Sequence, residues 1–116
     1  MYRQFNKSSY RTKSKYNNKT KTYNGKTYDS IREATHAEEL DWRIKAGEVK
    51  EVIPQYKIPL KINDRHIANY YIDFKVVLSD GDIEYHEVKG FETDLWRLKW
   101  KMTEALYPEY NLILIK

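Results

Sequence analysis

The sequence predicts a small mixed α/β (α+β) domain, in the order β-hairpin, helix, three strands, helix and strand. The 3.6-residue apolar periodicity of helices occurs over residues 30–46 and 93–106. Stretches of alternating or β-branched apolar residues, typical of strands, occupy residues 51–62, 70–78, 82–89 and 112–115. The length of 116 residues fits one such domain.

Charge is divided unevenly along the chain. Residues 1–28 contain eight basic residues and no acidic residue, whereas residues 29–116 contain 13 basic and 17 acidic residues, a net charge of −4. Residues 1–19 also lack Val, Ile and Leu, so they cannot bury enough apolar surface to offset the entropy of ordering. We therefore expect a flexible basic arm over residues 1–19 and a single domain over residues 20–116.

Turn and capping residues define the first elements of the domain. Asn24-Gly25 between Thr and Tyr residues predicts a tight hairpin. Ser30-Ile31-Arg32-Glu33 is a capping-box pattern, which opens a helix that runs to about Ala46, with Gly47 as its C-cap. At 100° per residue, Glu33 lies at the centre of the apolar stripe formed by Ala37, Leu40 and Ile44.

The later elements follow from proline, glycine and apolar positions. Pro54 and Pro59 place the strand over residues 51–62 near an edge of the sheet. The fully apolar strand over residues 112–115 is expected at an interior position of the sheet. The second helix is expected to turn one apolar face inward, formed by Leu95, Leu98, Met102 and Leu106.

Composition excludes several classes of function. No apolar run approaches the roughly 20 residues of a membrane span, and the N-terminus lacks a signal-peptide stretch. The chain has no cysteine, which excludes disulfides, thiolate nucleophiles and Cys-rich zinc sites. His36, His66 and His86 lack the spacing of zinc ligands, and no glycine-rich nucleotide-binding motif is present. We therefore expect a soluble cytoplasmic protein.

The strongest candidate site lies on the second predicted hairpin. Glu87 and Lys89 are two residues apart on a strand and therefore project from the same face. A two-residue loop in this hairpin would set Asp73 opposite Val88, on the other face. A three-residue loop ending at Gly81 sets Asp73 directly opposite Glu87, and Gly81 suits the bulge position of that turn. We favour the three-residue loop.

Two carboxylates opposite each other repel unless a cation compensates them. Hard carboxylate oxygens suit Mg²⁺ or Mn²⁺, which also bind substrate phosphate. Beside such a metal, Lys89 would hold or deprotonate an attacking water and offset charge on a scissile phosphate. Glu33, the acidic residue of the first helix that is aimed inward, would supply the third carboxylate.

These residues resemble a known family. Asp73 followed by Glu87-Val88-Lys89, with an acidic residue on a preceding helix, resembles the PD-(D/E)XK nuclease superfamily, whose fold is restriction-endonuclease-like. Residues 28–116 are similar in element order to that fold's core, a central mixed four-stranded sheet flanked by helices in the order α-β-β-β-α-β. More narrowly, the chain resembles small phage-encoded members, some of which resolve Holliday junctions, on the segments Asn24 to Ser30, Tyr71-Ile72-Asp73-Phe74 and Glu87-Val88-Lys89-Gly90. Ile72 stands where the family name has Pro.

The resemblance implies a Mg²⁺- or Mn²⁺-dependent endonuclease that hydrolyses phosphodiester bonds of double-stranded or branched DNA, in phage recombination or DNA processing in the host cytoplasm. It implies that Lys89 is the catalytic lysine and that Lys99, on the inward face of the second helix, contacts phosphate. It also implies a metal site made of Glu33, Asp73, Glu87 and the carbonyl of Val88. Because so small a domain seldom encloses DNA alone, we also expect a homodimer with two sites for paired cuts.

The arm interleaves basic and aromatic residues. Lys and Arg suit contacts to phosphates, and Tyr suits stacking on bases or sugars, while the alternative is a role in solubility alone. Contacts of this kind carry little sequence information. We expect DNA binding by Arg3, Lys7, Arg11, Lys13, Lys15, Lys19 and Lys21.

Each assignment has an alternative. Glu87 and Lys89 would also suit an ion pair on a solvated face. Glu33 would also suit the reciprocal position of the capping box. Lys99 would also suit a lysine whose aliphatic stem covers the core. Glu48-Val49-Lys50 repeats the Glu-Val-Lys tripeptide without a paired Asp upstream, and we interpret it as surface charge. For the whole protein, the alternatives are a non-catalytic DNA-binding or regulatory phage protein on a nuclease-like fold, and a structural protein whose arm binds acidic partners.

Overall fold

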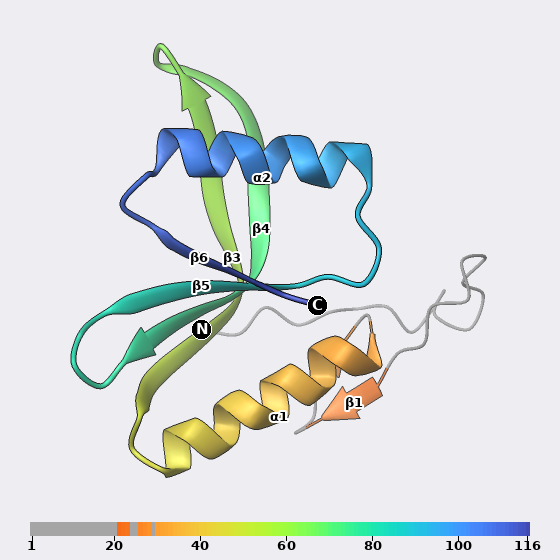
Figure 1. The fold of residues 1–116 in the computed structure, drawn as a ribbon, viewed down its shortest axis with the longest axis vertical. Coiled ribbons are helices and arrows are strands. Elements are labelled where there is room, and N and C mark those ends of the chain that lie inside the picture. Colours follow the sequence, from red (N-terminus) through yellow and green to blue (C-terminus); the bar gives the residue numbers. More distant parts are fainter. Residues whose placement is uncertain (1–20, 24–25, 29) are drawn as a thin grey trace.

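The computed structural model describes residues 21–23, 26–28 and 30–116. Four strands form the main sheet, in the order β3-β4-β5-β6. They are β3 (Val49–Ile62), β4 (Arg65–Leu78), β5 (Ile83–Val88) and β6 (Asn111–Ile115), and the helices are α1 (Ile31–Lys45) and α2 (Asp94–Leu106). β3, β4 and β5 are antiparallel neighbours and β6 is parallel to β5, so the sheet is mixed. The predicted order of elements is confirmed (Figure 1).

A separate two-stranded sheet precedes α1. Its strands, β1 (Lys21–Tyr23) and β2 (Lys26–Tyr28), are antiparallel, with Tyr23 paired to Lys26. The predicted hairpin is therefore confirmed in its strands. Its turn residues, Asn24 and Gly25, lie outside the described residues, as does the predicted arm over residues 1–19.

Both ends of α1 are capped as the sequence predicts, within one residue. The Ser30 hydroxyl accepts a hydrogen bond of 3.0 Å from the N–H of Glu33. At the other end Ala46 is the C-cap, and Gly47 follows with a φ of +84°. The N–H groups of Gly47 and Glu48 donate back to the carbonyls of Ile44 and Arg43, a Schellman motif.

β4 is longer than predicted, because a tight turn joins it to the end of β3, which starts two residues earlier than predicted. Asn63 and Asp64 have φ values of +51° and +64°, and they connect Ile62 directly to its partner Arg65. Asn and Asp tolerate this left-handed conformation, although the pair is a weaker turn pattern than Asn-Gly. β4 therefore starts at Arg65 rather than at residue 70. His66, which falls between the two predicted strands, lies in a strand. β3 is an edge strand, as its prolines predict.

The ribbon formed by β3 and β4 bends in its middle (Figure 1). The packing of β4 changes sides between Phe74 and Ile72, which places the bend near Gln55 and Asp73. Gln55 has a φ of +52° inside β3, a conformation uncommon for a residue other than glycine. On one side of the bend Phe74 and Val76 pack into a cluster with α1. On the other side Tyr70 and Ile72 pack into a cluster with α2. Because of the bend, even-numbered residues of β4 pack into two different clusters, one on each side of the sheet.

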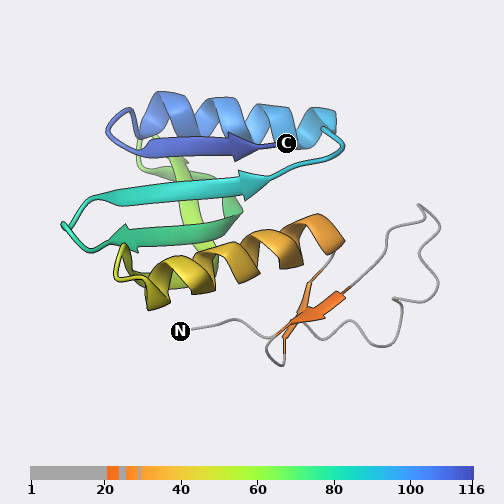
Figure 2. The same cartoon turned by 60° about the horizontal axis from the view of Figure 1, so that its bottom comes forward.

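The two helices cover opposite faces of β5. Val88 packs with Ala34 and Leu40 of α1, whereas Tyr85 packs with Trp96 of α2. Figure 2 shows α2 and α1 on either side of the central strands. The side chains of β5 therefore alternate between two apolar layers, which explains why most of this strand is buried.

The predicted inward face of α2 is correct for Met102 and Leu106, which pack against the α2 cluster, and wrong for Leu95 and Leu98. Leu95 and Leu98 are 62% and 55% exposed, whereas Trp96 and Thr103 are buried. The helix carries two apolar stripes that differ by about one residue, and the stripe with the larger aromatic area is the one buried. A hydrogen bond of 3.1 Å from the Trp96 indole to the hydroxyl of Tyr70 also favours that orientation.

The predicted interior position of residues 112–115 is also wrong, because β6 lies at the edge of the four-stranded sheet. Its apolar side chains are nevertheless covered on both faces. Leu112 and Leu114 pack into the α2 cluster, and Ile115 packs against the α1 cluster. An all-apolar strand thus indicates two covered faces, not two flanking strands.

We predict that Gly47→Ala lowers the free energy of unfolding by about 1 kcal/mol, because Ala is disfavoured at positive φ. The effect is conformational, since a Cβ at this position meets no atom within 4 Å. Gly47→Asn serves as the control and should lose less, because Asn tolerates this conformation. Equal losses for both variants in urea unfolding would contradict this explanation.

Candidate active site

Asp73 and Glu87 face each other across β4 and β5. Phe74 pairs with His86 and Val77 with Ile83, so the next position in this register sets Asp73 opposite Glu87. The loop is the predicted three-residue one: the N–H of Leu78 donates to the carbonyl of Asp82, and Gly81 has a φ of +98°. The predicted register is confirmed.

The carboxylate of Glu87 is buried and held by three groups. Glu87 is 4% exposed. Its Oε1 accepts hydrogen bonds from the Tyr70 hydroxyl at 2.8 Å and from the N–H of Asp73 at 3.3 Å. Lys89 Nζ lies 3.6 Å from Oε2. Burial raises the pKa of Glu87, although the Tyr70 hydrogen bond and the charge of Lys89 oppose this shift.

Asp73 accepts hydrogen bonds on both oxygens. The N–H of Val88 donates to Oδ2 at 2.8 Å, and the Gln55 side-chain amide donates to Oδ1 at 3.4 Å. Burial raises the pKa of Asp73 well above its usual range, and the nearby charges of Glu33 and Glu87 raise it further. The three predicted carboxylates therefore share one electrostatic environment.

Glu33 points into the domain, as its place on the helical stripe predicts. It is 6% exposed, in the first turn of α1. Its backbone N–H is used in the helix cap, while its carboxylate acts on Asp73. The capping role of Ser30 and the inward direction of Glu33 are therefore compatible.

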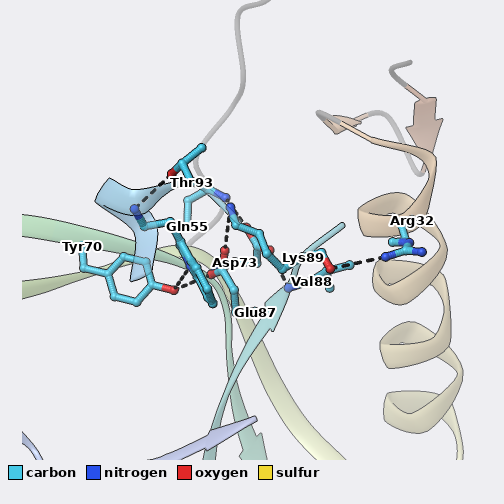
Figure 3. A network of polar contacts seen from close by, with 9 residues as sticks. Arg32, Gln55, Tyr70, Asp73, Glu87, Val88, Lys89 and Thr93 are labelled. Atoms are coloured by element: carbon cyan, nitrogen blue, oxygen red, sulfur yellow. Dashed lines mark hydrogen bonds and ion pairs between the residues drawn. The ribbon is translucent and has the colours of Figure 1, made fainter. Parts of the chain in front are cut away.

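Lys89 lies directly after β5, beside the carboxylates (Figure 3). Its ammonium is 5.3 Å from the centre of the Trp96 ring, a cation–π contact in addition to its approach to Glu87. Its backbone is fixed as well, because the N–H of Lys89 donates to the carbonyl of Ile115 in β6 at 2.8 Å. Lys89 and Glu87 therefore lie on the same side of the strand end, as their spacing predicts.

The remaining predicted residues lie elsewhere. Lys99 is half-buried, and its ammonium donates to the carbonyl of Asn69 at 3.1 Å, so its inward direction is confirmed while its contact with phosphate stays a prediction. Lys21 belongs to β1. Outside the described residues lie Arg3, Lys7, Arg11, Lys13, Lys15 and Lys19.

Three residues of this network escaped the sequence analysis. The Trp96 indole donates a hydrogen bond to the hydroxyl of Tyr70. This hydroxyl in turn donates to Glu87 (Figure 3). Gln55 reaches Asp73 from the strained point of β3. Strict alternation along β4 sends Tyr70 to the face opposite Asp73, so only the bend could have revealed its role. Gln55 lies in an ordinary strand pattern that gives no indication of it.

Comparison with known proteins identifies the family. Residues 13–116 match the family described as Protein of unknown function (DUF1064). The chain belongs to this family. No curated protein and no solved structure matches the DUF1064 chain. No helix in its described part is long and apolar enough to cross a membrane.

The donor chemistry of the DUF1064 site fits a hard divalent cation, although its carboxylates are not closed around one. Asp73 and Glu87 offer carboxylate oxygens with raised pKa values, and Lys89 supplies one nearby positive charge. In the described part of the chain, no group of three or more His, Asp or Glu side chains is arranged to hold a metal ion. Hydrogen bonds from Tyr70, Gln55 and the Val88 N–H instead occupy Glu87 Oε1 and both oxygens of Asp73.

We predict that Asp73→Asn stabilises the metal-free fold at pH 7, because it removes a buried charge with two acidic neighbours. The raised pKa means that folding binds a proton at Asp73. The stability from this group is full below about pH 4 and is lost as the pH rises through the folded-state pKa. Urea unfolding should therefore show a gap between variant and wild type that widens above pH 4.

Glu51→Gln, which changes an exposed carboxylate on β3, is the control and should show no such widening. Mg²⁺ should raise the stability of the wild type and leave that of Asp73→Asn unchanged. A wild type that is more stable than Asp73→Asn at pH 7 without metal would contradict the electrostatic account.

Proposed function

We propose that this protein is a metal-dependent DNA endonuclease with a restriction-endonuclease-like fold. The observation that carries the proposal is the pairing of buried Asp73 and Glu87, with Lys89 Nζ 3.6 Å from Glu87 at the end of β5. Repelling carboxylates beside an ammonium are costly for a purely structural role, and perturbed groups of this kind concentrate at functional sites. The resemblance to junction-resolving nucleases makes four-way-junction DNA the substrate to examine first.

In this proposal Asp73 and Glu87 hold Mg²⁺ or Mn²⁺, with Glu33 and the Val88 carbonyl as further ligands. The bound metal would act as a Lewis acid on the phosphate and lower the pKa of a water. Lys89 orients the attacking water and offsets the charge that develops on the phosphate. Tyr70 and the Val88 N–H fix the orientation of the two carboxylates before substrate binds.

The charge distribution supports DNA as the partner. The acidic site itself repels a polyanion, so attraction has to come from another part of the chain. The first 28 residues, with eight basic and no acidic residues, provide it by sequence. The tyrosines between these basic residues suit stacking on bases or sugars. Recognition by backbone and shape agrees with a nuclease selective for branched structures.

One observation favours a non-catalytic DNA-binding or regulatory protein instead. Tyr70, Gln55 and the Val88 N–H donate to three of the four carboxylate oxygens of Asp73 and Glu87, and Lys89 Nζ lies 3.6 Å from the fourth. This network therefore holds together without a metal. Such a protein would bind DNA through its basic segment and would leave the DNA uncut. The two functions differ in a direct test of cleavage.

We predict that Lys89→Ala lowers the rate of DNA cleavage by about 10²–10³-fold, because it removes the cation at the reacting phosphate. The assay uses linear, supercoiled and four-way-junction DNA with Mg²⁺ or Mn²⁺. Lys50→Ala is a closely matched control, since Lys50 ends the other Glu-Val-Lys tripeptide, at residues 48–50, and is exposed. It should cut at the wild-type rate.

Two results would contradict the nuclease. One is a wild type that cuts none of these substrates with either metal, which favours the non-catalytic alternative. The other is equal loss of cleavage in the Lys50 and Lys89 variants, which would show that the position of the lysine is irrelevant.

We predict that deletion of residues 1–19, which contain six basic residues, weakens DNA binding and flattens its salt dependence. The slope of log K against log salt should fall by at most about 5, since each released phosphate contact contributes about 0.9. Mg²⁺ binding, followed by thermal stabilisation, should be retained. An unchanged slope would assign this segment to solubility alone.

A further inference from the structure

A pocket of about 430 Å³ opens between the first turns of α1 and the ends of β5 and β6. The parallel strands β5 and β6 end at its floor with Val88 and Ile115. Crevices at the carboxyl ends of parallel strands are frequent ligand sites, and this volume falls in the lower part of their usual range. The pocket lies on the α1 side of β5, whereas Asp73 and Glu87 face the α2 side.

Arg32 stands at the rim of this pocket and reaches the active-site segment. Its Nη1 donates to the carbonyl of Lys89 at 3.3 Å, and its guanidinium lies against Gly90. In Figure 3, Val88 and Lys89 lie between Arg32 and the two carboxylates. The guanidinium therefore stands next to the residue that would act on the scissile phosphate.

The guanidinium of Arg32 is available for a ligand. It is exposed, and within the described residues it has no carboxylate within 4 Å, in contrast to Arg43 and Arg97, which are paired with Glu48 and Glu92. One of its five N–H donors is used by the carbonyl of Lys89, and the remaining donors can bind two oxygens of a phosphate. The acidic residue of the pocket, Glu39, instead faces His36, with Oε1 3.6 Å from Nδ1.

The walls of the pocket suit the rest of a nucleotide. Ile31, Val88 and Ile115 present apolar surface, and Ile31 is 48% exposed. A base or a deoxyribose buries apolar area on such walls, whereas a free phosphate would use only the arginine.

We propose that this pocket is a nucleotide subsite, in which Arg32 binds a backbone phosphate adjacent to the scissile one and the apolar walls receive the attached nucleoside. The assignment deepens the nuclease function and rests on it. The cut strand would pass over the end of β5, with the scissile phosphate at Lys89 and the neighbouring nucleotide beside α1. Arg32 is a substrate contact that also fixes the backbone of the catalytic lysine.

The test measures binding of a fluorescent four-way junction in Ca²⁺, across a range of salt concentrations, for Arg32→Ala, Arg32→Lys and Arg43→Ala. Arg32→Ala should weaken binding about tenfold and reduce the salt slope by about 1. Arg32→Lys should restore the slope but not the affinity, because it keeps the charge and loses the fork. Arg43→Ala removes the same charge at the far end of α1 and should bind as the wild type does.

A second measurement follows the methyl groups of Ile31 and Ile115 by NMR. Thymidine 5′-monophosphate should shift them, whereas inorganic phosphate should not. The subsite would be overturned if Arg32→Ala bound the junction as tightly as Arg43→Ala does. It would also be overturned if the nucleotide left the Ile methyl chemical shifts unchanged. Both measurements are independent of cleavage. A wild type that cuts DNA while Arg32→Ala binds normally would therefore reject the subsite and support the nuclease. Binding that depends on Arg32 in a protein that cuts no DNA would reject the nuclease and support a nucleotide-binding role for the pocket.

Discussion

The repulsion between the carboxylates of Asp73 and Glu87 is the constraint on which the centre of this domain depends. Both are buried on one face of the β4–β5 pair, a position at which like charges destabilise a sheet. Hydrogen bonds from Tyr70 and the Val88 N–H, together with the ammonium of Lys89, hold the pair in place. Much of the surrounding structure therefore brings donors and positive charge to this point.

The bend of the β3–β4 ribbon places hydrogen-bond donors next to the two carboxylates. A straight β4 would send Tyr70 to the α1 side of the sheet, away from Glu87. The bend instead turns the first half of β4 toward α2, where the Trp96 indole orients the Tyr70 hydroxyl. The positive φ of Gln55 occurs at this point, in contact with Asp73. Backbone strain and the buried carboxylate thus coincide, as is common at functional sites.

The candidate site could be predicted because local residue chemistry determines it. The buried face of α2 and the position of β6 could not, because they depend on packing between distant parts of the chain. Gly81 defined the loop, and the loop defined the register that joins Asp73 to Glu87. The direction of Glu33 followed from helical periodicity alone. The buried face of α2 did not follow, because two apolar stripes compete on that helix and the Tyr70 contact favours one of them. The edge position of β6 also depends on what covers it and not on its own residues.

The parallel pairing of β5 with β6 has a consequence for how the domain folds. β3, β4 and β5 are linked by short hairpin loops, whose closure costs little entropy. β6 joins β5 only after the chain has crossed over through α2, so the segment that must close before the bond from Lys89 to Ile115 can form is longer than either hairpin loop. Contacts of this kind form late in folding. The antiparallel scaffold with its acidic pair can therefore assemble first, and the lysine backbone is fixed when the final strand docks.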